Sequence, residues 1–432
     1  MRRVSLALFV IAALSAFAAD PSANKQQIDS MYPDLNKLYV DLHQNPELAF
    51  QEKQTSAKLA ERLKAMGYDV TTGVGGTGIV AVMKNGAGPT VLLRTDMDAL
   101  PIEEKTGLPF ASHVTEKNPA GETVPVMHAC GHDIHMTSWI GTAKLMADNK
   151  QQWHGTLMLV GQPAEEVVTG ASAMIKDGLF TKFPHPDYAF AVHDDDSMPA
   201  GVVGFHPGPF RASADSVDIT IFGRGGHGAK PQATIDPVLI ASKTVVALHN
   251  IISREIDPQE PAVITVGSIH GGTQNNIIPD QVKLQLTVRS YSPVVRKHLL
   301  ASIERVAKGE SLAGGSPKEP VVTVKPGTDT VVNDPETTAR IVSALKKSLG
   351  DSAVHEMPAY MTSEDFSQYG QNGTKAVLLH VGAQEPTKFA SAKQNGTLLP
   401  TVHTSLWQPD PEPTIKTAIM VETTALMDLM GK

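Results

Sequence analysis

Four side chains that can bind a metal ion lie within eight consecutive residues, at His128, Cys130, His132 and His135. Asp133 stands among them and could orient one of the imidazoles. Cys130 is the only cysteine of the chain, so it cannot form an internal disulfide. Because a thiolate is both a metal ligand and a nucleophile, this cysteine predicts either a metal site or a covalent reaction.

The first residues have the three-part pattern of a secretory signal peptide. Arg2 and Arg3 supply positive charge, residues 4–19 carry none, and Ala16-Phe17-Ala18 offers a cleavage site flanked by small residues. The apolar run is shorter than the roughly 20 residues that a membrane-spanning helix needs. We therefore expect residues 1–19 to be removed and the mature protein to be secreted or periplasmic, with no membrane association. A thiol kept in an oxidising compartment is best explained by a metal or a reaction that occupies it.

Length and charge restrict the remaining possibilities. The 432 residues are enough for about two or three domains. The formal net charge is −8, and no basic run interleaves with aromatic residues. Nucleic acid is therefore not an expected partner.

Short apolar runs alternate with helical patterns over most of the chain. The pattern from residue 30 to residue 65 predicts a helix that Gly67 ends. Runs that are apolar throughout indicate strands buried on both faces, as in an α/β layered domain. These runs cover residues 79–82, 91–93, 156–160, 188–192 and 376–379.

A different pattern covers residues 212–324. Its order is a strand with alternating apolar residues, a helix that begins at Asp236-Pro237, strands at 263–269 and 282–288, a helix from Ser292-Pro293, and a last strand near residue 320. The order β-α-β-β-α-β is that of a ferredoxin-like unit. We predict a smaller α+β domain, residues 212–324, inserted into a larger α/β domain made of residues 20–211 and 325–432.

The strands of the larger domain place the chemically active residues together. In open α/β sheets, ligands gather at the carboxyl ends of the strands. Several acidic, histidine and cysteine side chains follow predicted strands or lie in neighbouring loops, so we expect them to converge at one sheet edge. They are Asp98, Cys130, His132, Glu165, Glu166, His193 and His403.

A mixed set of sulfur, nitrogen and oxygen ligands suits Zn²⁺, Mn²⁺, Co²⁺ or Ni²⁺ better than Mg²⁺ or Ca²⁺. A thiolate or a carboxylate can bridge two such ions, which together activate water and polarise a carbonyl group. Glu165 and Glu166 are adjacent, so their side chains should diverge. One can bind metal while the other stays free as a general base, and the residues alone leave open which does which.

These motifs resemble those of the M20 metallopeptidases, in particular the M20D amidohydrolases, which include hippurate hydrolases, N-acyl-amino-acid amidohydrolases and auxin-conjugate hydrolases. The resemblance covers nearly the whole mature chain. It rests on residues 43–48, 94–101, 128–133, 162–166, 225–227, 271–279 and 363–366, and on His403.

The resemblance implies a zinc-peptidase-like catalytic domain, an inserted lid that also forms a homodimer, and two divalent metal ions. The implied ligands are Cys130, His132, Glu166, His193 and His403, with Cys130 as the bridge. Glu165 would be the general base and Asp98 would orient His132. His227 would reach the partner's site and stabilise the oxyanion, while Asn276 and Arg289 would help to bind the substrate's carboxylate. The implied reaction is hydrolysis of N-acyl or N-aroyl amino acids or small dipeptides.

The chain departs from the family pattern at two places. Ile134 follows His-Asp where glycine is usual, and Asp194-Asp195-Asp196 follows His193 where small or apolar residues are usual. All metal ligands remain. We expect the acidic triplet to alter the pocket rim and to disfavour anionic acyl groups.

Two other interpretations compete with metal-dependent hydrolysis. In the first, Cys130 is the nucleophile of a metal-independent cysteine hydrolase. In the second, the chain is a non-catalytic peptide- or metal-binding protein on the same fold. The first leaves the paired glutamates, His193 and His403 without a role, and the second leaves Glu165 without one.

Overall fold

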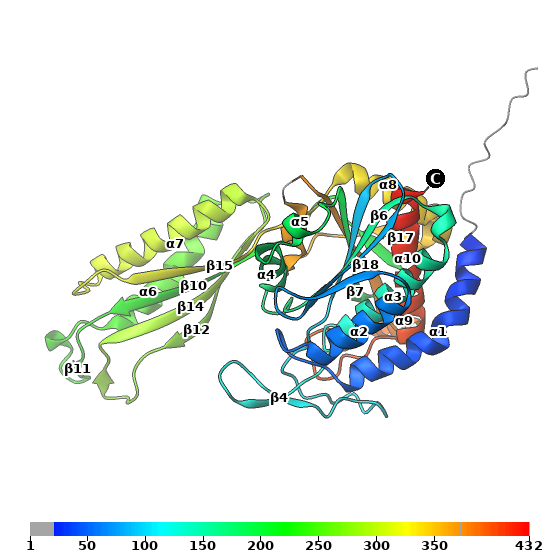
Figure 1. Cartoon of the computed structure of the whole chain (residues 1–432). Helices are drawn as coiled ribbons and strands as arrows, with labels where there is room; N and C mark the ends of the chain where they lie inside the picture. The colour runs from blue at the N-terminus through cyan, green and yellow to red at the C-terminus, as the bar shows by residue number, and fades with distance from the viewer. Residues whose placement is uncertain (1–20, 372, 432) are drawn as a thin grey trace, which may run out of the picture.

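The computed structural model describes residues 21–371 and 373–431, so the predicted signal peptide lies outside the described residues. The larger domain is built on an eight-stranded sheet (Figure 1). Its spatial order is β1 (Asp69–Val74), β2 (Gly78–Asn85), β6 (Gly155–Gln162), β3 (Thr90–Asp96), β7 (Tyr188–Pro199), β18 (Lys375–Gln384), β8 (Val203–Phe205) and β17 (Val354–Glu356). The four central strands, β6, β3, β7 and β18, run parallel to one another.

Helices cover both faces of this sheet, which explains why its central strands contain runs of apolar residues. Along β2, Ile79 and Ala81 belong to one apolar core, while Val80 belongs to another core on the opposite face. The first core packs under α1 (Pro21–Gln44), α2 (Lys53–Ala65), α3 (His132–Asp148), α8 (Pro335–Leu349) and α10 (Pro411–Met430). The second packs under α4 (Gly170–Lys176) and α5 (Leu179–Lys182). The predicted layered α/β domain is therefore confirmed.

The prediction of a single helix from residue 30 to residue 65 is wrong. The chain leaves the helical conformation after Gln44, where Asn45 precedes Pro46, because proline disfavours the helical conformation of the residue before it. The second helix then begins at Lys53. The carboxylate of Glu47 accepts the backbone N–H groups of Gln54 and Thr55 and so satisfies two donors at that helix start.

The inserted segment forms a separate four-stranded antiparallel sheet. Its strands are β10 (Ser213–Phe222), β12 (Ala262–His270), β14 (Gln281–Ser290) and β15 (Val321–Thr328), in the spatial order β12-β14-β10-β15. Helices α6 (Pro237–Asn250) and α7 (Pro293–Ala313) pack on it around an apolar core of its own. Asp236 and Ser292 cap these two helices by accepting backbone N–H groups, as their sequence context predicts. The last strand continues to Thr328, past residue 324.

The four-stranded lid extends away from the larger domain (Figure 1). The short strands β9 (Gly208–Arg211) and β16 (Val331–Asn333) pair beside the chain crossings into and out of the lid. At the far end, β11 (Gly226–His227) pairs with β13 (Ile277–Ile278). The remaining elements are β4 (Thr115–Lys117), β5 (Thr123–Pro125) and α9 (Pro386–Asn395). Within the described ranges, no helix combines the length and the apolar character needed to cross a membrane.

Candidate metal centre

The seven residues predicted to converge do lie at one edge of the large sheet. Asp98 follows β3, Glu165 and Glu166 follow β6, and His193 lies on β7. Cys130 and His132 flank the start of α3, and His403 lies in the loop after α9. Close-packed donor groups are formed by Cys130, His132 and His193, by Cys130, Glu166 and His403, and by His132, Glu165 and Glu166, with the donor atoms of each group within 4.8 Å of one another.

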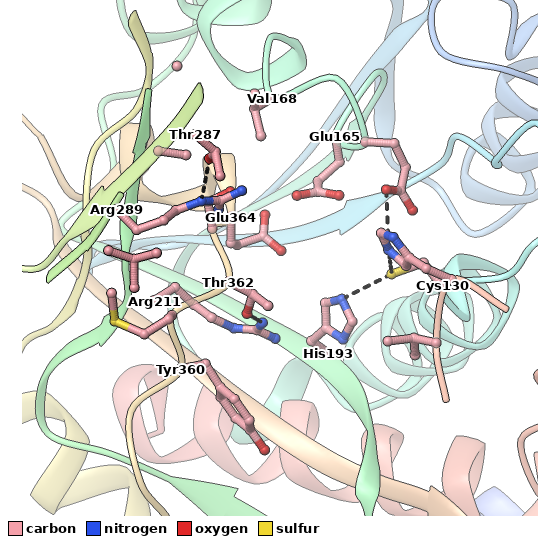
Figure 2. Close-up of a pocket in the computed structure, with 18 of the residues that line it drawn as sticks. Cys130, Glu165, Val168, His193, Arg211, Thr287, Arg289, Tyr360, Thr362 and Glu364 are labelled. Carbon is pink, nitrogen blue, oxygen red and sulfur yellow. Dashed lines mark hydrogen bonds and ion pairs between the residues drawn. The ribbon is translucent and has the colours of Figure 1, made fainter. Parts of the chain in front are cut away.

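Cys130 is common to the first two of these groups. Its Sγ lies 3.2 Å from Nε2 of His403 and 3.7 Å from Nε2 of His193. Nε2 of His403 also lies 3.4 Å from Oε2 of Glu166. Figure 2 shows Cys130 beside His193, at one end of a pocket. A thiolate in this position can contribute to two adjacent metal ions.

Hydrogen bonds to backbone carbonyls orient two of the histidines. Nδ1 of His132 donates to the carbonyl oxygen of Asp98 at 2.7 Å, and Nδ1 of His193 donates to that of Asp194 at 2.6 Å. Each ring therefore keeps Nε2 as the nitrogen with a free lone pair, turned towards the other donors. A second-sphere partner of this kind is typical of metal-bound histidine.

Asp98 contacts His132 and both glutamates. The resemblance implies that Asp98 orients His132, and its backbone carbonyl makes the close contact, whereas Oδ1 is 3.7 Å from Nδ1. Instead, Oδ1 accepts the backbone N–H of Glu165 at 2.9 Å and Oδ2 accepts that of Glu166 at 3.0 Å. Asp98 thus positions both glutamates through their main chain.

The loop that carries the two glutamates has an unusual backbone. Ala164 and Val168 have positive φ angles of 53° and 50°, a region that non-glycine residues seldom adopt. At Gly170 a Cβ atom would lie 1.6 Å from the carbonyl oxygen of Pro163, so only glycine fits there. Such strain persists where the surroundings over-determine the conformation, as they often do at functional sites. In Figure 2 the carboxylate of Glu165 points into the pocket.

Gly131 explains how Cys130 and His132 can flank the helix start. Its φ is 78°, and a Cβ atom would lie 2.2 Å from Oδ2 of Asp194. The absence of a side chain lets the chain turn into α3 directly against the Asp194 carboxylate. Packing therefore requires glycine at position 131, between the two donor residues Cys130 and His132.

The donor atoms fit a pair of divalent ions chemically. Nε2 of His132 and Oε1 of Glu166 are buried, and neither has a hydrogen-bond partner among the described residues. Burial lowers the pKa of His132 to about 3, which keeps its imidazole neutral as a metal ligand must be. Burial also raises the pKa of Glu166 to about 8, and burial together with Glu166 raises that of Cys130. A buried cluster of acids and one thiol is stable in its ionised form only beside cations, and divalent ions would supply that charge.

His135 and Asp96 lie next to the cluster but are occupied by other contacts. Nδ1 of His135 is 2.7 Å from Oδ1 of Asp96, and its Nε2 is 3.1 Å from Oδ1 of Asp194. Burial lowers the pKa of His135, but the two carboxylates outweigh burial and raise it to about 10. Asp96 also accepts from Arg94 at 2.6 Å. These groups form a buried charged layer behind the donors.

The three residues of the acidic triplet line the pocket, and each makes contacts within the protein. Asp194 contacts His135 and His193, and Asp196 accepts the backbone N–H of Val402. Oδ2 of Asp195 lies 2.6 Å from Nδ1 of His380 and accepts the Tyr360 hydroxyl at 2.9 Å. The expected effect of the triplet on anionic acyl groups therefore stays a prediction.

The pocket beside the cluster has a volume of about 880 Å³ and lies between the two domains. Cys130, Glu165 and His193 line it from the larger domain, and Arg289 lines it from strand β14 of the lid (Figure 2). Three lining residues, Arg211, Tyr360 and His380, escaped sequence reasoning. Arg211 contacts Thr362 and His380, which are 151 and 169 residues away, so no local pattern marks it.

His227 and Asn276 lie elsewhere. Both are exposed at the β11–β13 end of the lid, where the carbonyl of Asn276 accepts the backbone N–H of Gly228. Figure 1 shows this end on the side of the lid opposite the large sheet. Neither residue is among those that line the pocket of its own chain.

Comparison with known proteins places this site in a family. The family model described as "Peptidase family M20/M25/M40" matches residues 92–395. The hippurate hydrolase of Campylobacter jejuni is 42% identical over 287 residues, which are 66% of this chain and 71% of that protein. An N-acetylcysteine deacetylase of Bacillus subtilis is 34% identical over 78% of this chain and 87% of its own length. A crystal structure of a dinuclear metal-binding peptidase of the M20 family from Bacillus subtilis superposes with a TM-score of 0.76 at 28% identity, covering 93% of this chain and 99% of that one.

Proposed function

The chain belongs to peptidase family M20/M25/M40 and is a metal-dependent hydrolase of amide bonds, and we propose that its substrates are N-acyl or N-aroyl amino acids or small dipeptides. The observation that carries this proposal is the position of Cys130 in two donor groups at the end of a pocket that Glu165 also lines. The named activities of the two curated relatives support an N-acyl amino acid as the substrate class.

We assign the two metal ions to Cys130, His132, Glu166, His193 and His403, with Cys130 shared between them. When bound, divalent ions of this kind polarise the amide carbonyl and activate water for attack. The identity of the ions is proposed as Zn²⁺, Mn²⁺, Co²⁺ or Ni²⁺, from the mixed donor set.

Glu165 is the proposed general base. Its carboxylate faces the pocket, and Asp98 fixes its backbone. Glu165 takes a proton from the water that attacks the amide carbon and returns it to the nitrogen as the carbon–nitrogen bond breaks. The products are a carboxylic acid and an amine.

The site is completed, in this proposal, by a homodimer. His227 of the partner subunit would donate a hydrogen bond to the developing oxyanion. Support comes from the exposure of His227 and Asn276 at the lid end. Arg289 in the pocket wall would bind the substrate's carboxylate with its fork of N–H groups. Asn276 would assist from the partner rather than from the same chain.

Export is proposed from residues 1–19 alone, with a secreted or periplasmic location. Amino-terminal sequencing of the mature protein tests it. A sequence beginning at Asp20 is expected, and a retained Arg2-Arg3 segment would contradict export by cleavage.

One experiment tests the proposed reaction. The protein is stripped with a chelator and reloaded with single metals, metal content is measured, and a panel of N-acyl amino acids and dipeptides is assayed. Activity should vanish with the metal and return on reloading. The rival cysteine hydrolase predicts activity that survives complete metal removal and is lost on alkylation of the thiol. The raised pKa of Cys130 already opposes the thiolate that this rival needs. A binding protein would take up metal and ligand without turnover.

A further inference from the structure

Two arginines line the pocket, and neither has an acidic partner within residues 21–371 and 373–431. Arg211 donates from Nη2 to Nε2 of His380 at 2.9 Å and from Nη1 to the hydroxyl of Thr362. Arg289 donates to the hydroxyls of Thr287, at 3.1 Å, and Ser363, at 2.8 Å. All of these acceptors are neutral. Each guanidinium keeps N–H groups without a protein acceptor, among them the buried Nε of Arg211.

The acids that line the same pocket have other partners. Asp215 pairs with Arg296, Glu364 pairs with Arg94, Asp194 contacts His135, and Asp195 contacts His380. Asp196 accepts a backbone N–H and pairs with neither pocket arginine. Two divalent ions would more than offset the thiolate and the two glutamates of the metal centre. Neither pocket arginine is therefore paired directly with a carboxylate of the described residues.

Arg211 is held rigidly in place. Its guanidinium carbon lies 5.0 Å from the ring centroid of Tyr360, a cation–π arrangement. Nδ1 of His380 donates to Asp195, so its Nε2 is left as the acceptor for Arg211. Tyr360 is anchored by the same Asp195 carboxylate. Asp195 of the acidic triplet thus helps to position a cation at the pocket wall.

The two arginines occupy different parts of the wall. Arg289 extends from lid strand β14, whereas Arg211 ends β9 in the larger domain. Figure 2 shows the two side chains apart, with Arg211 nearer to His193 and Arg289 nearer to Glu364. Each is anchored by its own hydroxyl, Thr362 for Arg211 and Ser363 for Arg289. The two guanidinium groups therefore offer two separate positions at which a carboxylate could bind.

We propose that Arg211 is a specificity-determining residue that binds a second carboxylate of the substrate, so that the preferred substrates are dianionic N-acyl amino acids. This inference rests on the proposed amide hydrolysis. Arg289 would bind the α-carboxylate. The second carboxylate belongs either to the amino acid's side chain or to the acyl group, and both positions share the same recognition chemistry. Arg211 fits this task because guanidinium groups bind carboxylates with paired N–H donors.

The test compares acids with their neutral amides. N-acetylglutamate is paired with N-acetylglutamine, and N-succinylalanine with N-succinamoylalanine, on the metal-loaded wild-type enzyme. A charge-assisted hydrogen bond predicts that kcat/KM for one acid exceeds that for its amide by about 10- to 100-fold. The pair that shows the ratio identifies where the second carboxylate is attached.

Substitutions then show whether Arg211 causes the acid-to-amide ratio of kcat/KM. Arg211→Gln should bring the acid-to-amide ratio close to one, and Arg211→Lys should keep part of it. Arg289→Gln should lower kcat/KM for acids and amides alike. The exposed lid residue Arg254 provides the charge-matched control, and Arg254→Gln should leave the ratio as in the wild type.

A wild-type ratio near one for both pairs overturns the proposal. So does an equal loss on acid and amide in Arg211→Gln, which would mean a general catalytic or structural role. Calorimetric binding of N-acetylglutamate and N-acetylglutamine to metal-loaded Glu165→Gln gives the same comparison without turnover. If the loaded wild type hydrolyses no amide, the proposed function fails, while this binding comparison still decides the role of Arg211.

Discussion

Asp98 holds Glu165 by its main chain, with Oδ1 of Asp98 accepting the Glu165 backbone N–H at 2.9 Å. The other oxygen accepts the Glu166 N–H at 3.0 Å. One buried carboxylate therefore sets the positions of both the proposed base and a proposed metal ligand. The direct contact of Asp98 with His132 passes through its carbonyl oxygen, which a side-chain substitution leaves in place.

Substitution of Asp98 should consequently loosen both glutamates. Asp98→Ala removes both acceptors, and we expect metal affinity or kcat to fall about 10- to 100-fold, as for other residues that support metal ligands. Asp98→Asn keeps one acceptor oxygen and should lose less. Metal titration and kcat measured on both variants check this order. Equal affinity and kcat in Asp98→Ala and wild type would show that the loop holds its shape without Asp98.

Substitutions of the two adjacent glutamates should affect different properties of the enzyme. Glu165→Gln should lower kcat by about 10²- to 10⁴-fold with metal content unchanged, because it removes the base but no ligand. Glu166→Gln should lower metal content first, because Oε2 of Glu166 lies with Cys130 and His403. Elemental analysis beside steady-state kinetics separates the two effects. The reverse pattern would exchange their roles.

Mixed dimers test the proposed contribution of His227. Glu165→Gln and His227→Ala subunits should each be inactive as homodimers. After unfolding and refolding together, a mixed dimer has one intact site, so about a quarter of wild-type activity should return for random pairing. Refolding Glu165→Gln with Glu165→Gln/His227→Ala is the matched control and should restore nothing. If the first mixture also stays inactive while dimers form, His227 does not act across subunits.

Gly131 should be far less tolerant of a side chain than a comparable glycine elsewhere. Gly131→Ala would place a methyl group 2.2 Å from Oδ2 of Asp194, whereas Gly86 has a similar φ of 85° and no atom near the added Cβ. Gly86→Ala should therefore cost only the backbone strain, ~1–2 kcal/mol. Gly131→Ala should lose more stability and also metal, because Cys130 and His132 must move. Urea unfolding and metal analysis of both variants provide the comparison. Equal losses would mean that Asp194 yields to the methyl group.

Glu422 should make stability depend on pH. It is buried in helix α10, where burial raises its pKa from 4.5 to about 7 despite hydrogen bonds from Thr142 and Ser138. The folded state thus favours the protonated acid, and this contribution is present below pH 4.5 and is lost as the pH rises through 7. Between pH 5 and pH 8, the free energy of unfolding of Glu422→Gln should rise by ~1–3 kcal/mol relative to that of wild type.

Denaturant unfolding at both pH values measures that gain. Glu412→Gln, on the exposed first turn of the same helix, is the control and should show little change between the two pH values, because exposed ion pairs contribute little. A pH-independent difference between Glu422→Gln and wild type would mean that Glu422 titrates normally.

The layered architecture was predictable because its signals are local. Strands buried on both faces, such as β3 and β6, carry continuous apolar runs, and the helix caps at Asp236 and Ser292 depend on neighbouring residues only. Pro46 signals the break between α1 and α2, but the helical pattern on both sides of it predicts one continuous helix. The contact of Glu47 with Thr55 then helps to fix where the second helix begins.

The sequence by itself determined which donor groups the candidate metal centre contains, because cysteine, histidine and glutamate follow the ends of strands that its apolar runs predict. Tertiary structure alone decided how those groups are used. It assigned the free nitrogen of His132 and His193 through carbonyl contacts, gave the Asp98 carboxylate to two backbone amides, and turned Asp195 towards His380. It also brought Arg211 to the pocket through partners more than 150 residues away. Periodicity and capping act over a few residues, whereas these roles depend on which distant atoms packing brings within hydrogen-bond range.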